Sequence, residues 1–201
     1  MGELCVHSVL VTGANRGLGL GFVQHFLRMP KPPQWIFATC RDPKGQRAQE
    51  LQNLASKHPN IIIIPLRCLL EAFLPLLKKA AQGSPGSGLS CSKAAIINMS
   101  SYAGSIEDVY LWDFGQVVSY RCSKAALKML SKCQSLAYRE HGVLCVALHP
   151  GWVQTDMGDT GSYKPPLTVD DSLQGMLKVL SSLSEKETGT FLDWEGKVLP
   201  W

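Results

Sequence analysis

The sequence predicts an α/β fold, in which a doubly wound, mostly parallel sheet of about six strands is flanked by helices. Three observations predict it. A β-branched run at 9–11 leads into a glycine-rich turn and then into an apolar helical pattern. Short apolar runs alternate with segments of helical periodicity along the chain. The run 61–64 is four isoleucines without polar alternation, which is typical of a parallel strand buried on both faces.

The first half of the chain gives the pattern βαβαβ. Strands are expected over 5–11, 35–39 and 61–64, and helices over 17–29 and 45–58. Pro30 ends the first helix, because proline cannot donate the main-chain hydrogen bond that a helix interior needs. This order of elements is the nucleotide-binding half of a Rossmann-type sheet.

The second half continues the alternation. Strands are expected over 94–99, 143–148 and 190–192, and helices over 68–81, 119–141 and 168–182. Pro75 either kinks the first of these helices or marks the first turn of a shorter one, and Thr168 or Asp170 caps the last. The connection 102–118 is long and irregular, which is common for functional loops. No internal repeat or boundary is visible, so we expect residues 1–201 to form a single Rossmann-type domain.

Composition and charge fit a globular protein with one core. The chain has 201 residues, 45% hydrophobic and 18% charged, with a net charge of +4. This mild charge, without a basic run, argues against a nucleic-acid partner, and no apolar run is long enough for a membrane span. The seven cysteines are scattered without a C-x-x-C pair, so we expect reduced, buried thiols and no metal site. With no signal peptide in view, we expect a cytoplasmic protein.

The turn after the first strand carries glycines at positions 13, 17 and 19. Gly13 allows a sharp turn, Gly17 allows the main chain to approach a pyrophosphate, and Gly19 allows the helix to pack closely on the strand. The start of the helix offers free N–H groups and the positive end of its dipole to phosphates. Because the spacing is G-x-x-x-G-x-G and not the common G-x-G-x-x-G, an ordinary glycine-rich turn is the alternative.

Tyr120 and Lys124 lie four positions apart at the start of the helix 119–141, so their side chains share one face. A neighbouring ammonium lowers the pKa of a phenol, which lets the tyrosine pass a proton to a carbonyl oxygen. Ser101 closes the preceding strand, where its hydroxyl can hydrogen-bond the same oxygen. This spacing of Tyr and Lys is common on helix surfaces, and the order of glycine turn, serine and Tyr-x-x-x-Lys is what favours a catalytic site.

These motifs resemble the short-chain dehydrogenases/reductases, and among them the sniffer-like and C-factor-like carbonyl reductases. The resemblance rests on segments 12–19, 98–101, 120–124 and 150–151, on the long serine-to-tyrosine loop, and on the ending 196–201. It implies that the catalytic residues are Ser101, Tyr120 and Lys124. It also implies that the nicotinamide is lined by Pro150, Gly151, Val153 and Thr155, the last bonding its carboxamide or the phosphates.

The charges near the second strand bear on the choice of cofactor. A site for NAD places an acidic residue there, whereas this sequence has Cys40 followed by Arg41, and Arg16 in the glycine turn. Arginine grips phosphate bidentately, so the two guanidinium groups predict NADP(H) with its 2′-phosphate; the alternative is that both are merely solvated. The expected cofactor-binding residues are Gly13, Asn15, Arg16, Gly17, Leu18, Gly19, Arg41, Tyr120, Lys124, Pro150, Gly151, Val153 and Thr155.

The sequence departs from the family after the third strand. The family continues there with an Asp-containing turn, a helix, a strand ending in Asn-Asn-Ala-Gly and a long helix carrying a catalytic asparagine, whereas here 61–66 joins directly to 67–70. We therefore expect an internal deletion that removes a central strand. The sheet must then close up, with 94–99 moving beside 5–11, or gape, because unpaired buried main-chain groups are costly. The helix 68–81, which pairs subunits in family dimers, is truncated, so a homodimer would be weakened.

Two functions follow from these expectations. The first is an NADPH-dependent oxidoreductase that reduces a small-molecule carbonyl substrate to an alcohol by hydride transfer, with Tyr120 as general acid. The alternative is a catalytically impaired or inactive relative, like a splice variant, that retains nucleotide binding or acts only through protein interaction. Nucleotide binding with turnover would favour the first function, and binding without turnover the second.

Overall fold

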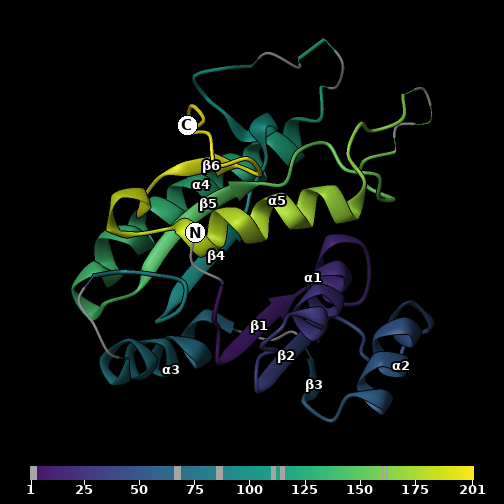
Figure 1. The fold of residues 1–201 in the computed structure, drawn as a ribbon. Helices are drawn as coiled ribbons and strands as arrows, with labels where there is room; N and C mark the ends of the chain where they lie inside the picture. Colours follow the sequence, from purple (N-terminus) through teal and green to yellow (C-terminus); the bar gives the residue numbers. More distant parts are fainter. Residues whose placement is uncertain are drawn as a thin grey trace. The chain divides into compact units, whose positions relative to one another are not determined.

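The computed structural model describes residues 4–65, 69–84, 88–109, 112–113, 116–159, 161 and 163–201. The strands are β1 (Ser8–Thr12), β2 (Trp35–Cys40), β3 (Ile61–Pro65), β4 (Ala95–Met99), β5 (Leu144–His149) and β6 (Phe191–Asp193) (Figure 1). The α-helices are α1 (Gly17–Arg28), α2 (Gln49–Lys57), α3 (Leu69–Gly83), α4 (Val118–Tyr138) and α5 (Val169–Ser182). Short 3-10 turns are η1 (Gln46–Ala48), η2 (Tyr102–Gly104), η3 (Arg139–His141) and η4 (Glu185–Glu187).

The predicted α/β architecture is confirmed, with all strand pairs parallel. The strands form two sheets of three, in the orders β1-β2-β3 and β4-β5-β6. In the described part of the chain no ladder joins β1 to β4, so the expectation that 94–99 would move to pair with the first strand is wrong. That a strand of the family is missing between these two sheets stays a prediction.

The chain divides into two compact units, one with the strands β1–β3 and the other with β4–β6. The glycine-turn unit comprises Cys5–Leu74 and Trp152–Leu173, and the serine–tyrosine unit comprises Met1–Leu4, Pro75–Gly151 and Gln174–Trp201. The boundary in α3 falls at Pro75, inside the helix and beyond its first turn, so the reading of Pro75 as a first-turn residue is wrong. The single-domain organisation stays a prediction.

In the glycine-turn unit, α1 packs on β1 and α2 packs on β3. The fully buried side chains include Val23 of α1, Ile36 of β2 and Leu51 of α2. The isoleucine run is not buried on both faces as expected, because β3 is an edge strand of its sheet and Ile62 is 37% exposed. A continuous apolar run cannot distinguish a central strand from an edge strand, since both need one buried face.

In the serine–tyrosine unit, β5 is the central strand and is fully buried from Leu144 to Leu148. The helix α4 packs on β4 and β5. Asn98 of β4 links the two elements, because its amide donates to Ser131 Oγ at 2.9 Å and to Gln134 Oε1 at 2.7 Å. These bonds hold the helix that carries Tyr120 and Lys124 in a fixed register on the sheet.

The cysteines only partly follow the expectation that they are buried. Cys40 and Cys145 are buried, whereas Cys5, Cys122 and Cys133 are exposed. Apolar surroundings in the sequence were therefore a poor guide to burial at these three positions. Among the described helices, none is both long and apolar enough to cross a membrane.

Candidate active site

The glycine turn has the backbone geometry that its sequence requires. Gly13 and Gly17 adopt φ angles of +63° and +52°, which L side chains rarely adopt. A Cβ on Gly19 would lie 2.2 Å from the carbonyl oxygen of Gly13, so only glycine allows this close approach of the helix to the turn. Ala14 N–H donates to Thr39 O at 3.0 Å and thereby joins the turn to the end of β2.

The first turn of α1 presents main-chain donors. Arg16 is the N-cap residue, and no side chain caps the N–H groups that follow it at Gly17 and Leu18. No acidic residue lies in this first turn, so the positive end of the helix dipole is not neutralised from within the helix. Thr155 lies beside the turn, with its Cγ2 3.6 Å from the position of a Cβ on Gly17. This arrangement can receive phosphate oxygens.

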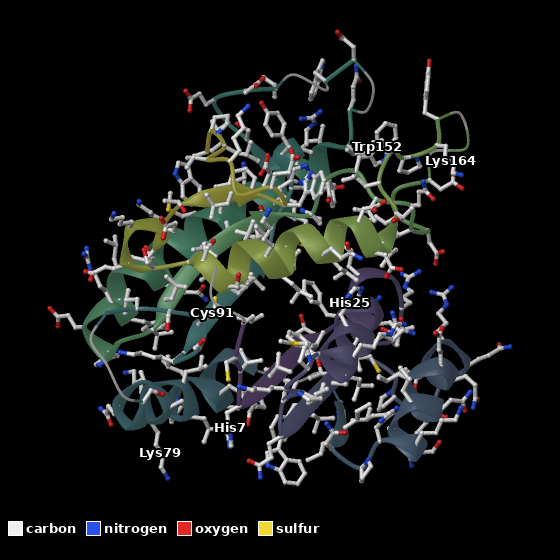
Figure 2. All side chains as sticks on the ribbon, in the orientation of Figure 1. His7, His25, Lys79, Cys91, Trp152 and Lys164 are labelled. Carbon is white, nitrogen blue, oxygen red and sulfur yellow. The ribbon has the colours of Figure 1, made fainter. Side chains whose placement is uncertain are left out.

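The loop that carries Thr155 is held by its own hydrogen bonds. The indole Nε1 of Trp152, labelled in Figure 2, donates to Gly158 O at 2.7 Å. Gln154 N–H donates to Leu167 O at 2.8 Å, and Val153 is 5% exposed. Val153 and Thr155 therefore keep a defined position within the glycine-turn unit, as a residue that contacts a bound cofactor must.

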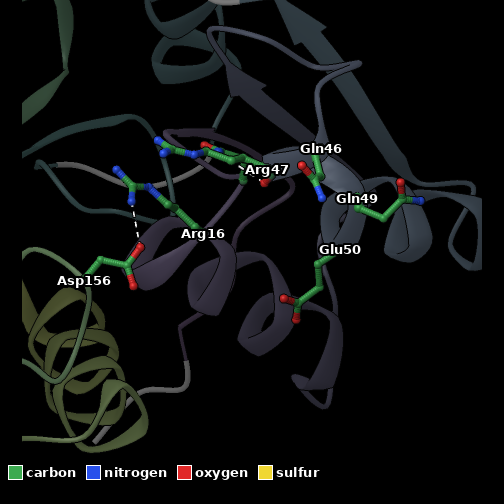
Figure 3. A pocket seen from close by; sticks show the side chains of 7 residues that line it. Arg16, Gln46, Arg47, Gln49, Glu50 and Asp156 are labelled. Carbon is green, nitrogen blue, oxygen red and sulfur yellow. Dashed lines mark hydrogen bonds and ion pairs between the residues drawn. The ribbon is translucent and has the colours of Figure 1, made fainter.

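A pocket of about 390 Å³ lies beside the glycine turn (Figure 3). Its lining residues are Asn15, Arg16, Gln46, Arg47, Gln49, Glu50 and Asp156. In Figure 3 the guanidinium groups of Arg16 and Arg47 lie on the same side of the pocket, whereas Glu50 points away from them. Arg16 Nη1 pairs with the Asp156 carboxylate at 2.8 Å. Both partners are exposed, so this ion pair is weak and an incoming anion can displace it.

The pocket contains residues that the sequence did not single out. Arg47 lies on η1, and the Asn15 amide donates to its main-chain oxygen at 3.4 Å. Arg41 is exposed and is not one of the residues that line the pocket. The sequence gives only a weak signal for Arg47. It is a second basic residue soon after β2, and it lies in a segment whose pattern is typical of an ordinary surface helix.

Tyr120 and Lys124 share one face of α4, as their spacing predicts. The Lys124 ammonium lies 5.6 Å from the centroid of the Tyr120 ring. It donates to the carbonyl oxygen of Met99, the last residue of β4, at 2.8 Å. Burial lowers the pKa of Lys124, because removal from water disfavours the charged form. The lysine is therefore held at the end of the strand that leads to Ser101.

Ser101 begins the turn that packs against Lys124. Its Oγ accepts from Ala103 N–H at 3.2 Å and caps η2. A Cβ on Gly104 would lie 2.6 Å from Lys124 Cβ, so the turn and the helix are in direct contact. Arg121, which follows Tyr120 in α4, donates from Nη1 to Ala103 O at 3.2 Å. This bond ties the turn to the helix.

Two further basic groups of the serine–tyrosine unit are removed from water, Lys128 almost completely and His149 in part. Lys128 is 3% exposed, with its ammonium 3.9 Å from the centroid of the Phe191 ring, and burial lowers its pKa to about 8. Burial lowers the pKa of His149 to about 4, with Asp193 acting in the opposite direction and Lys128 in the same direction. His149 is therefore neutral at pH 7, and it directly precedes Pro150 and Gly151.

The structure brings the expected site residues together in two groups. Gly13, Asn15, Arg16, Gly17, Leu18, Gly19, Val153 and Thr155 belong to the glycine-turn unit, as does the exposed Arg41. Ser101, Tyr120, Lys124, Pro150 and Gly151 belong to the serine–tyrosine unit. That the two groups face one cleft stays a prediction.

Comparisons with known proteins agree with these motifs. A sequence profile described as short chain dehydrogenase matches residues 69–164. The C-signal protein of Myxococcus xanthus is 44% identical over 87 residues, which cover 43% of this chain and 51% of that protein.

Solved structures match over nearly the whole chain. The NADPH-bound carbonyl reductase from chicken fatty liver is 57% identical, with a TM-score of 0.94 over 100% of this chain and 96% of that chain. The carbonyl reductase Sniffer of D. melanogaster is 34% identical, with a TM-score of 0.87 over 98% of this chain and 100% of that chain. Identity of this extent, together with the glycine turn and the Tyr-x-x-x-Lys pair, places this chain in the short-chain dehydrogenase/reductase family.

Proposed function

We propose that this protein is an NADPH-dependent reductase that converts a carbonyl compound to an alcohol, with Tyr120 as the general acid. The observation that carries this proposal is the Lys124 ammonium, which lies 5.6 Å from the centroid of the Tyr120 ring while the turn of Ser101 packs on the same lysine. A phenol beside a cation is a better proton donor than an isolated one, because the cation stabilises the phenolate that remains.

The residues of the glycine-turn unit fit NADPH. The uncapped first turn of α1 offers main-chain donors to a pyrophosphate, and Gly17 leaves room for its close approach. Arg16 and Arg47 line a pocket of about 390 Å³, and two guanidinium groups suit a 2′-phosphate. Carbonyl reductases in the family have been solved with NADPH or NADP bound, which supports the same choice.

The residues of the serine–tyrosine unit fit a carbonyl substrate. NADPH, when bound, would supply a hydride to the carbonyl carbon. The Tyr120 hydroxyl would donate its proton to the carbonyl oxygen, and the Ser101 hydroxyl would hydrogen-bond that oxygen and fix its direction. Lys124 would stabilise the Tyr120 phenolate after the proton has left. His149, next to Pro150 in the same unit, is neutral and adds no positive charge of its own at pH 7.

A second candidate function is nucleotide binding without turnover. It is favoured by the interruption of the sheet, because β1 and β4 belong to separate ladders and the glycine turn and Ser101 follow these two strands. A catalytic site that needs both units then depends on how firmly they are held together. In this case the glycine-turn unit would still bind NADPH, but hydride would not be transferred to a substrate.

Turnover by matched variants tests the proposal. NADPH consumption would be followed by absorbance with a reactive dicarbonyl or a quinone as substrate. We expect Tyr120→Phe to lower kcat/KM at least about 100-fold, because the general acid is lost. The affinity for NADPH, measured by fluorescence titration, should change little.

The control is Tyr138→Phe, a tyrosine of the same helix that packs against Ala94 and Val143. It should retain wild-type turnover. Full activity of Tyr120→Phe would refute the assignment of the general acid. NADPH binding by the wild-type chain without turnover of either substrate would favour the second candidate.

A further inference from the structure

The ending 196–201, a motif that the proposed function leaves unused, has a defined place in the serine–tyrosine unit. We infer that Trp201 is a positioning residue: it fixes the turn that follows Ser101, so that the serine hydroxyl keeps its direction toward the substrate. This inference rests on the proposed function for its effect on catalysis, and on the contacts of Trp201 for its effect on the turn.

The tail folds back on β6 and so brings Trp201 to the sheet. Gly196 N–H donates to Asp193 O at 3.0 Å, and Gly196 has a φ of +90°, which closes a tight turn after the strand. Leu199 N–H then donates to Phe191 O at 2.8 Å, so the tail runs alongside β6 in the opposite direction. The main chain that leads to Trp201 is therefore held against β6.

The indole ring anchors Trp201. Its centroid lies 6.1 Å from that of Phe191, a side chain that is fully buried. The Lys132 ammonium lies 5.8 Å from the ring centroid, and Lys132 is itself held by a 3.0 Å bond to Gly189 O. The ring is thus placed by α4 and β6, two elements that do not belong to the turn after Ser101.

The main-chain oxygen of Trp201 reaches the segment after η2. It accepts from Ile106 N–H at 2.8 Å, from Glu107 N–H at 3.1 Å and from Ser105 Oγ at 2.8 Å. Ser105 is 5% exposed, and its Oγ also accepts from Asp108 N–H at 2.9 Å. The Trp201 oxygen therefore binds three consecutive residues, and the Ser105 hydroxyl adds Asp108 to the same compact loop end.

The other end of the same segment is held by α4. Ser101 Oγ caps the turn, Arg121 donates to Ala103 O, and Gly104 packs on Lys124. The segment 101–108 is therefore fixed at its catalytic end by the helix of Tyr120 and at its far end by Trp201. Loosening the far end would let the turn shift, and small displacements at a reacting centre have large effects on rate.

Hydrogen exchange and kinetics on the full chain test this role. Trp201→Ala keeps a main-chain oxygen but loses the ring that places it, so we expect the amides of Ile106 and Glu107 to exchange at least about tenfold faster. We expect KM for the carbonyl substrate to rise or kcat to fall by about fivefold or more, with NADPH affinity unchanged. Trp201→Phe retains an aromatic ring and should restore most of both readouts.

A second variant keeps the tail intact. Ser105→Ala removes the hydroxyl that joins Trp201 O to Asp108 N–H, and should speed exchange at Asp108. Its matched control is Ser181→Ala, because Ser181 is a half-buried serine of α5 whose hydroxyl, among the described contacts, bonds only to Lys178 O of its own helix. The control should change neither exchange at 105–108 nor turnover.

Unchanged exchange at 105–108 in Trp201→Ala and Ser105→Ala would overturn the inference, and so would faster exchange with wild-type KM and kcat. A wild-type chain that turns over no carbonyl would refute the proposed function instead. The exchange measurement would then still decide whether Trp201 fixes the turn.

Discussion

At the scale of single residues, the charge of the pocket beside the glycine turn decides which nucleotide fits it. Arg16 and Arg47 supply two positive groups, and Asp156 neutralises one of them through an exposed ion pair. An exposed pair contributes little to stability, whereas a guanidinium–phosphate contact is bidentate and stronger. A 2′-phosphate should therefore take Arg16 from Asp156 and bind both arginines.

Arg47→Ala tests this directly. We expect the affinity for NADPH to fall about tenfold or more while that for NADH changes little, because one charge-assisted contact to the 2′-phosphate is lost. Arg41→Ala should have a smaller effect, since Arg41 does not line the pocket. Calorimetric titration of each variant with both nucleotides measures the ratio.

The control is Arg139→Ala, whose guanidinium pairs with Glu185 in the other unit. An Arg41→Ala loss that exceeds the Arg47→Ala loss would show that the pocket is not the 2′-phosphate site.

The arginines near the glycine turn show how far single residues of the site could be predicted from the sequence. Arg16 could be placed because it lies inside a motif whose backbone is dictated by three glycines. Arg41 was predicted to bind the cofactor because it directly follows β2, and Arg47 was not singled out. Which of them turns toward the glycine turn depends on η1 and on the bond from Asn15 to Arg47 O, a contact between residues 32 positions apart. No local pattern encodes such a contact.

At the scale of elements, the contact between η2 and α4 couples Ser101 to Lys124. Gly104 has no room for a side chain, because a Cβ there would lie 2.6 Å from Lys124 Cβ and 2.7 Å from Lys124 C. The backbone of the helix cannot yield at this point without moving the lysine. The turn and the helix therefore have to be displaced together.

Gly104→Ala should lower the free energy of unfolding by about 1–3 kcal/mol, as overpacking does, and should reduce turnover as well. Gly83→Ala is the matched control, since nothing lies within 4 Å of a Cβ at that helical position. That change should be neutral or stabilise the protein by up to about 1 kcal/mol. Urea unfolding and turnover assays measure both, and equal effects of the two variants would refute a close contact at Gly104.

Helices and strands were predicted to within a few residues, because apolar runs and their periodicity are local signals. The final helix is an example: Thr168 caps α5, with its Oγ1 accepting from Asp171 N–H at 3.1 Å, and Asp170 does not. The segment 102–117 lacks such periodicity, and its residues 105–107 are held by bonds to Trp201, 96 residues beyond Ser105. The sequence therefore singled out Trp201 only as part of the ending 196–201 and gave no indication of its contact with the turn after Ser101.

At the scale of the whole molecule, we propose that an internal deletion explains the two separate sheets. The family strand that is missing from the sequence would stand between the strands that begin the two halves, and in the described residues β1 and β4 lack a common ladder. The sequence predicted the deletion from the absent Asn-Asn-Ala-Gly motif, whereas which of its two consequences the sheet adopts depends on contacts far apart in the chain that no local pattern encodes.

Thermal unfolding of the isolated chain with and without NADPH tests most directly whether this interrupted fold is a working nucleotide-binding protein. At NADPH near 100 times its Kd, a single competent site should raise Tm by about 5–10 °C, and NADH at the same concentration should raise it far less. A cooperative transition whose Tm does not change with NADPH would contradict the account, since a folded glycine turn with Arg16 and Arg47 beside it would then bind no cofactor.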